Sequence, residues 1–279
     1  MKCVVGAGAL AASATIMLAH CQLSGTTKVA AAPAESKSAR AKTPVPVDHP
    51  PVAPAPAAEA AAAWSDAEII SALEECVRLL APTGAVVELS KPIRNGQCGT
   101  PAPVLLKRVD SVELSPPAVV NCRIAAKVHT WIKESLQPLA LEMLGKRVAR
   151  VNTASAYMCR QRIGSSSEKL SEHSFADALD ISAFVTTDDR SIDVLTHWGP
   201  TARDRNAKMA PNPAGGGDAR ALRDVGPTGS STNEAEFLHK VHNGACGIFG
   251  TVLGPEANEA HRNHLHLDLA ARKHSAFCE

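Results

Sequence analysis

Aromatic residues and an excess of one charge are both scarce in this chain of 279 residues. It has one Tyr and five Phe, and its formal net charge is only +1. Proteins that bind nucleic acid rely on basic surfaces and on aromatic rings that stack with bases. No basic cluster interleaved with aromatic residues is present, so we expect no nucleic-acid partner. The hydrophobic share of 45% and the charged share of 20% are typical of an ordinary globular protein.

A long apolar run is absent as well. The stretch from Val4 to Ala19 follows Lys2, is rich in Ala and Gly, and falls short of the roughly 20 apolar residues of a membrane span. This pattern is typical of an export signal, and we predict a signal peptide over residues 1–21. The segment LAHC, which ends at Cys21, resembles a lipoprotein processing box and makes Cys21 a lipidation candidate. His20 is unusual at that position, so cleavage with release, or an uncleaved anchor, stays open.

Paired cysteines of the CxxC type are also missing. Six single cysteines follow the predicted signal: Cys76, Cys98, Cys122, Cys159, Cys246 and Cys278. An even number of dispersed cysteines in an exported protein favours disulfides over a clustered thiolate zinc site. We therefore expect an exported periplasmic protein stabilised by disulfides whose pairing is open. Its only membrane contact would be a lipid anchor at Cys21.

Composition divides the rest of the chain into two parts. Residues 22–64 are dominated by Ala, Pro, Lys and Ser, which bury too little apolar surface to fold, so we predict a semi-rigid linker. The sequence SDAE from Ser65 to Glu68 has the form of a helix capping box. One α+β domain is predicted over residues 65–279.

Within this domain the patterns predict N-terminal helices and a small antiparallel sheet. A second helix is expected to begin at Pro116 and Pro117, to kink or restart at Pro138, and to end at Gly145. Strands are expected over 148–151, 179–185, 192–195 and 264–269, a helix over 234–241, and a long loop over 199–233.

The predicted last strand, HLHLDL from His264 to Leu269, alternates polar and apolar residues without exception. Because strand side chains have a period of two, the leucines would face a core while His264, His266 and Asp268 share the other face. That face could carry a site, or it could be an ordinary polar surface exposed to solvent.

A second segment favours a site. His173 and Asp180 stand seven positions apart in SEHSFADALD, the first in a loop and the second at the entrance to a strand. Imidazole and carboxylate are ligands that zinc accepts, and three protein ligands leave a fourth position for water. Zinc lowers the pKa of such a water and polarises a carbonyl, which suits amide hydrolysis.

Several short segments carry a family resemblance: SAYMCR (155–160), SEH (171–173), ALD (178–180), HLH (264–266), Cys98-Gly99 and TVLGP (251–255). Together they resemble the bacterial extensin-like C-terminal domain family over about residues 73–278. That family is similar to the wider group of zinc peptidases that contains lysostaphin, D-Ala-D-Ala carboxypeptidases and hedgehog domains. The resemblance implies an α+β fold with a small sheet that carries a zinc site.

The resemblance also implies a role for each matched residue. His173, Asp180 and His266 would bind one zinc ion. His264 and Arg160 would be catalytic, His264 as a base or stabiliser and Arg160 as a partner for the oxyanion or a substrate carboxylate. Ser171 would bind substrate, and Asp268 would orient an imidazole. The alternatives without a role in a site are a surface charge for Arg160, a loop cap for Ser171 and a solvated strand end for Asp268.

One departure from the family pattern concerns the turn between the first two ligands. The family usually has Gly-Asn where this chain has Ala176-Asp177. Ala disfavours positive φ, and Asp177 could become an extra ligand or a perturbing charge. The other histidines have no matching motif and are interpreted as surface or structural residues.

The sequence thus predicts zinc-dependent hydrolysis of amide bonds in peptidoglycan stem peptides or cross-links, with peptidoglycan as the partner. The alternative function is a non-catalytic zinc-containing module that binds peptidoglycan or a protein. A third hypothesis is a disulfide-stabilised envelope protein without a metal.

Overall fold

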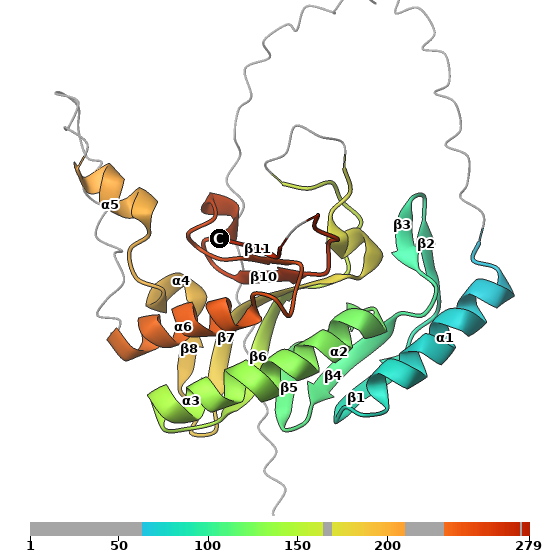
Figure 1. The fold of residues 1–279 in the computed structure, drawn as a ribbon, viewed down its shortest axis with the longest axis horizontal. Coiled ribbons are helices and arrows are strands. Elements are labelled where there is room, and N and C mark those ends of the chain that lie inside the picture. Colours follow the sequence, from blue (N-terminus) through green and yellow to red (C-terminus); the bar gives the residue numbers. More distant parts are fainter. Residues whose placement is uncertain (1–62, 164–168, 210–231, 274) are drawn as a thin grey trace, which may run out of the picture. The chain divides into compact units, whose positions relative to one another are not determined.

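The computed structural model (Figure 1) describes residues 63–163, 169–209, 232–273 and 275–279. They belong to one compact unit within Pro54–Glu279. The predicted signal peptide, Cys21 and nearly all of the predicted linker lie outside the described residues, as do residues 210–231 of the predicted loop.

The described residues form helices and strands that are mixed along the chain. The helices are α1 (Asp66–Leu80), α2 (Cys122–Trp131), α3 (Gln137–Leu144), α4 (Val194–His197), α5 (Ala202–Met209) and α6 (Thr232–Ala245), with a π-helical segment η1 (Ile132–Leu136) and the 3-10 turns η2 (Glu172–Phe175) and η3 (Glu259–His261). The strands are β1 (Ala85–Leu89), β2 (Ile93–Asn95), β3 (Cys98–Thr100), β4 (Val104–Val109), β5 (Val112–Val120), β6 (Val148–Ser155), β7 (Ala178–Thr186), β8 (Ser191–Asp193), β9 (Thr251–Leu253), β10 (Leu265–Asp268) and β11 (Phe277–Cys278). No helix in the described ranges is long and apolar enough to cross a membrane.

The first helix begins where the capping box predicts. The Ser65 hydroxyl accepts a hydrogen bond from the Glu68 N–H, and the Glu68 carboxylate accepts one from the Ser65 N–H at 2.8 Å. Both interactions satisfy donors that the first helical turn leaves without an intrahelical partner. Trp64, just before the cap, stacks on Arg94 and donates its indole N–H to the Ile93 carbonyl at 2.8 Å.

The prediction that a helix begins at Pro116 and Pro117 is wrong. Both prolines lie in β5, where the register between β4 and β5 shifts. The residues of β5 before the prolines pair with the end of β4, and those after the prolines pair with its start. Such an irregularity tolerates residues that lack an N–H donor. The helix begins instead after Asn121, whose side chain accepts the Ile124 N–H at 3.0 Å.

The sheet is large, which corrects the expected small sheet. In the described part of the chain it has nine strands in the order β1-β4-β5-β6-β7-β10-β9-β11, with β8 paired to β7. Most pairs are antiparallel, but β5–β6 and β9–β11 are parallel. The predicted sheet lacked β1, β4 and β5, whose Val- and Leu-rich sequences alternate between buried and more exposed positions. A two-residue turn with Asp110 at φ 49° joins β4 to β5.

Smaller differences concern three other expected elements. The expected strand 192–195 ends at Asp193, whose carboxylate caps α4 by accepting the Thr196 N–H at 3.1 Å. Part of the expected loop 199–233 forms α5. The strand expected over 264–269 is β10, which begins after His264, and β11 follows it.

Helices α2, α3 and α6 cross one face of the sheet in Figure 1. Trp131, on α2, is fully buried and lies edge-on to Phe184 and Phe249, and its indole donates to the Val241 carbonyl at 3.2 Å. The core therefore joins the helices to strands β6, β7, β9 and β10, and it fixes which side chains of those strands point to the opposite face.

All six predicted cysteines form disulfides, which confirms the disulfide framework. The pairs are Cys76–Cys122, Cys98–Cys159 and Cys246–Cys278. They tie α1 to α2, β3 to the segment after β6, and the end of α6 to β11, so that the edges of the domain are linked to its centre.

Candidate metal centre

Two neighbouring strands place the first two candidate ligands opposite one another. β7 and β10 are antiparallel, and His266 pairs directly with Asp180. The residues on either side of Asp180, Leu179 and Ile181, are fully buried in the core. Because side chains alternate along a strand, Asp180 and His266 share the face away from that core.

The turn η2 supplies the third candidate ligand, His173. The turn ends at Ala176, which adopts a left-handed conformation with φ 55° and donates its N–H to the His173 carbonyl at 3.1 Å. Ala176 thus has the backbone conformation that glycine adopts most easily, and the chain turns directly from η2 into β7.

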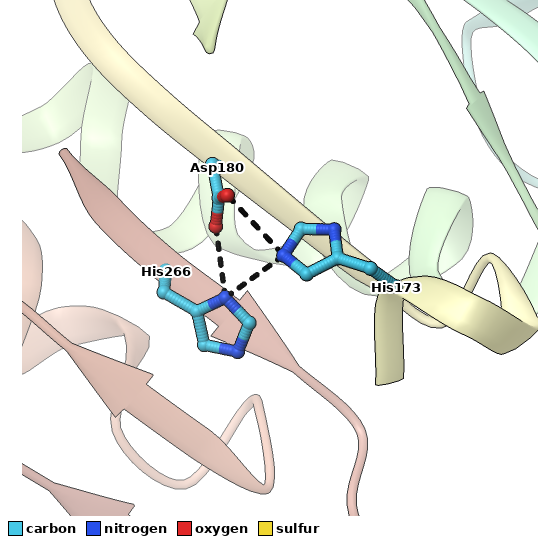
Figure 2. Close-up of side chains that lie close together, drawn as sticks. All are labelled: His173, Asp180 and His266. Carbon is cyan, nitrogen blue, oxygen red and sulfur yellow. Dashed lines mark hydrogen bonds and ion pairs between the residues drawn. The ribbon is translucent and has the colours of Figure 1, made fainter. Parts of the chain in front are cut away.

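The three side chains point toward one another from η2, β7 and β10 (Figure 2). His173 Nε2 lies 3.2 Å from Asp180 Oδ2 and 3.2 Å from His266 Nδ1, and His266 Nδ1 lies 2.8 Å from Asp180 Oδ1. Ligands of a tetrahedral zinc ion at about 2.0–2.1 Å are separated by about 3.3 Å. The donor set and its spacing therefore fit one zinc ion. The residues are 0%, 4% and 7% exposed for His173, Asp180 and His266.

The outer nitrogen of each imidazole is engaged, which leaves the inner one directed at the centre. His173 Nδ1 donates to the Ala156 carbonyl, and His266 Nε2 donates to Asp268 Oδ2 at 3.0 Å. Such partners hold the tautomer and the ring orientation that metal binding requires. Asp268 thus contacts His266 as an orienting group would, and its side chain is buried rather than solvated.

Without a bound metal ion, burial, hydrogen bonds and nearby charges set the pKa values of Asp180 and His266. Burial alone would raise the pKa of Asp180, but hydrogen bonds from His173 and His266 and their nearby charges outweigh it and hold this pKa well below its usual value. Burial lowers the pKa of His266, but hydrogen bonds to Asp180 and Asp268 outweigh burial and raise it to about 9. A cation bound at the centre would therefore displace a proton from His266.

His264 lies just before β10, beside the triad. Its Nε2 is 3.7 Å from Asp180 Oδ1, and its Nδ1 is 2.8 Å from Asn263 Oδ1. Burial lowers the pKa of His264, which keeps the ring neutral at neutral pH. This neutral imidazole is close enough to exchange a proton with a group bound at the centre.

A cavity of about 190 Å³ borders His266 and Asp268. Arg160 and Ser171 both line it, and the Ser171 N–H donates to the Arg160 carbonyl at 3.0 Å. The Ser171 side chain does not cap η2, although the residue stands at the N-cap position. The structure therefore brings both predicted substrate-contacting residues to one cavity beside the candidate ligands.

Asp177 lies away from the three candidate ligands. Its Oδ1 accepts a hydrogen bond from Asn121 Nδ2 at 2.9 Å, and burial raises the pKa of this carboxyl group. Asn121 also donates its N–H to the Ala176 carbonyl at 2.8 Å. Asp177 thus links the turn to the start of α2 and is not part of the His173–Asp180–His266 group.

His261 and Arg272 are two of the cavity residues that the sequence interpretation missed. His261 was interpreted as a surface or structural residue, yet its ring centre lies 5.2 Å from that of His264 and 5.7 Å from that of His266. Burial, followed by the charges of His266 and His264, lowers the pKa of His261 to about 4. Arg272 also lines the cavity, from the segment after β10. The spacing of His261, three residues before His264, was the only sequence signal.

A comparison with protein families finds one match that covers most of the domain. The model of the family described as "Extensin-like protein C-terminus" matches residues 74–213 and 218–279. The comparisons with curated proteins and with solved structures find no match. All three candidate ligands, His264, Arg160 and Ser171 lie within the matched residues.

Proposed function

The chain belongs to the Extensin-like protein C-terminus family, and from this premise we propose that it is an exported zinc peptidase. Its reaction is hydrolysis of amide bonds in peptidoglycan stem peptides or cross-links during cell-wall remodelling. The observation that carries the proposal is the buried His173–Asp180–His266 group, whose donor atoms lie at the spacing of zinc ligands beside a cavity.

The similarity to lysostaphin, D-Ala-D-Ala carboxypeptidases and hedgehog domains is part of the same proposal. It is supported by the ligand order His, Asp, His and by the HLH segment that ends in His266. The substrate class is supported by the export-like leader and the three disulfides, which suit an oxidising compartment where peptidoglycan is present. In this proposal the protein is periplasmic, with a lipid anchor at Cys21 as one alternative.

Zinc bound by the triad would supply Lewis acidity that polarises a carbonyl group and activates water. Asp268 and the Ala156 carbonyl hold the two imidazoles in the tautomers that bind. His264 takes a proton from the attacking water and delivers one to the leaving amine. Arg160 stabilises the negative charge that develops on the carbonyl oxygen, and Ser171 hydrogen-bonds the substrate.

The alternative is a zinc-containing module that binds peptidoglycan or a protein without hydrolysis. This alternative is based on the altered Ala176-Asp177 turn, because a changed turn could displace one of the candidate metal ligands on either side of it. Ala176 nevertheless adopts the left-handed conformation, and Asp177 turns toward Asn121. The turn therefore keeps His173 Nε2 within 3.2 Å of Asp180 Oδ2, so it gives no reason to prefer the module over the hydrolase.

The test combines metal content with digestion of purified sacculi. We expect one zinc per wild-type chain, loss of zinc in His266→Ala, and full zinc with at least about a 100-fold loss of hydrolysis in His264→Ala. His129→Ala is the matched control, because His129 lies on α2 and pairs with Asp110 instead of the triad.

Two outcomes contradict the proposal. If the folded wild-type protein binds no zinc when zinc is supplied, the proposed metal centre is wrong. A zinc-loaded protein that binds sacculi but releases no new fragments is the non-catalytic module.

A further inference from the structure

The cavity is lined by more arginines than carboxylates. Three arginines, Arg160, Arg162 and Arg272, meet two carboxylates, Glu172 and Asp268. Glu172 is occupied, because it pairs with Arg162 at 2.9 Å. Asp268 is occupied as well, because it accepts hydrogen bonds from His266 and from the Ala270 N–H. Among the described residues, Arg160 and Arg272 therefore have no carboxylate partner.

Arg272 is held in place by neutral groups. Its guanidinium donates to the Thr251 hydroxyl through Nε at 3.1 Å and also through Nη2, and it lies 5.5 Å from the centre of the Phe277 ring. Neither contact neutralises the charge, and the side chain is exposed at the rim of the cavity. Such an oriented guanidinium is suited to bind a carboxylate through two parallel hydrogen bonds.

The two residues that hold Arg272 in place are themselves fixed by the fold. β11, which contains Phe277, pairs with β9, which contains Thr251, and the Cys246–Cys278 disulfide ties β11 to the end of α6. The guanidinium thus lies against two residues that the sheet and the disulfide hold in place, so little ordering entropy opposes ligand binding there.

We propose that Arg272 anchors a carboxylate group of the substrate at the cavity rim while the scissile amide faces the metal centre. This inference rests on the proposed function and names the substrate class within it: peptides with a free carboxylate near the bond that is cut. Phe277 forms an apolar surface beside the anchor, which suits a small aliphatic side chain next to that carboxylate.

The carboxylate could be the C-terminus of the peptide or an acidic side chain. The probes are an N-acetylated peptide of four alanines with D configuration at the last two residues, its C-terminal amide, and the same amide with one internal glutamate. Dissociation constants are measured by calorimetry on the zinc-loaded His264→Ala protein, so that cleavage does not consume the probes.

We expect the free acid, or the glutamate peptide, to bind about tenfold more tightly than the neutral amide. Arg272→Gln removes this preference and leaves zinc affinity unchanged. Lys273→Gln is the matched control, because it removes the same charge from the neighbouring residue, which does not line the cavity, and it retains the preference.

Three results overturn the inference. The zinc-loaded His264→Ala protein binds the carboxylate probes no more tightly than the neutral amide, or this preference survives Arg272→Gln, or it is lost only in Arg160→Gln. A loss of zinc affinity in Arg272→Gln also overturns it, because Arg272 would then support the metal centre instead of binding a substrate carboxylate. The proposed function fails separately. If carboxylate binding requires Arg272 but the wild-type protein cuts no peptide, the anchor stands and the peptidase does not.

Discussion

Asp268 Oδ2 lies 3.0 Å from His266 Nε2, on the side of the imidazole opposite the nitrogen that faces Asp180. The same ring is thus held between two carboxylates, one in the candidate ligand set and one outside it. We predict that Asp268→Asn lowers zinc affinity about 10- to 100-fold without unfolding the domain, because the amide orients the ring without adding negative charge. Competition with a chromogenic chelator measures the affinity.

The control for this substitution is Asp193→Asn, which removes the carboxylate that caps α4 and is not part of the ligand set. Because Asn caps a helix about as well as Asp, we expect little change in either stability or zinc affinity. Equal affinities in wild type and Asp268→Asn would mean that the contact between Asp268 and His266 does not tune the metal.

The pH dependence of the metal-free protein follows from His266. Its pKa of about 9 exceeds the usual value of 6.5, so protonation stabilises the fold. This contribution is fully present below pH 6.5 and is lost as the pH rises through 9, and it amounts to about 3 kcal/mol. We predict that the free energy of unfolding in the presence of a chelator falls over this range.

Urea titrations at pH 6.5 and pH 9.5 test this prediction. His266→Gln removes the titrating group, and its unfolding free energy is expected to change far less between the two pH values. Zinc reverses the trend, because a proton on His266 competes with the metal and zinc adds more stability at the higher pH. A metal-free wild type that is equally stable at both pH values would contradict the assignment.

Local patterns in the sequence predicted the local features of the site. The alternation of HLHLDL predicted that Leu265 and Leu267 are buried and that His266 and Asp268 share the other face, because strand geometry fixes that periodicity. The capping box likewise predicted the first residue of α1. Each signal acts over a few residues and does not depend on the rest of the fold.

Features that depend on tertiary contacts were predicted poorly. A proline pair after a serine favours a helix start locally, but pairing with β4 and β6 places Pro116 and Pro117 in a strand. The size of the sheet was missed for the same reason, because strand pairing joins segments far apart in the chain. His261 lines the cavity with its ring near those of His264 and His266, and its spacing from His264 was too weak a signal to predict this.

The Cys98–Cys159 disulfide gives a last prediction, because Cys159 immediately precedes Arg160. Its segment also carries Met158, whose N–H donates to the His173 carbonyl at 3.1 Å. Replacing both cysteines by serine removes a cross-link over a separation of 61 residues, which costs about 4 kcal/mol of stability in the chain-entropy model.

The Cys76–Cys122 double serine variant is the matched comparison. It removes a cross-link over 46 residues, so its expected loss of stability is similar, but it lies between α1 and α2. We expect both variants to unfold at lower urea concentration and only the Cys98–Cys159 variant to bind peptide more weakly, because only that one frees the segment before Arg160. If the two variants lose peptide binding equally at a temperature where both are folded, Arg160 is held by its other contacts, the Ser174 hydroxyl and the Ser171 N–H, and not by the disulfide.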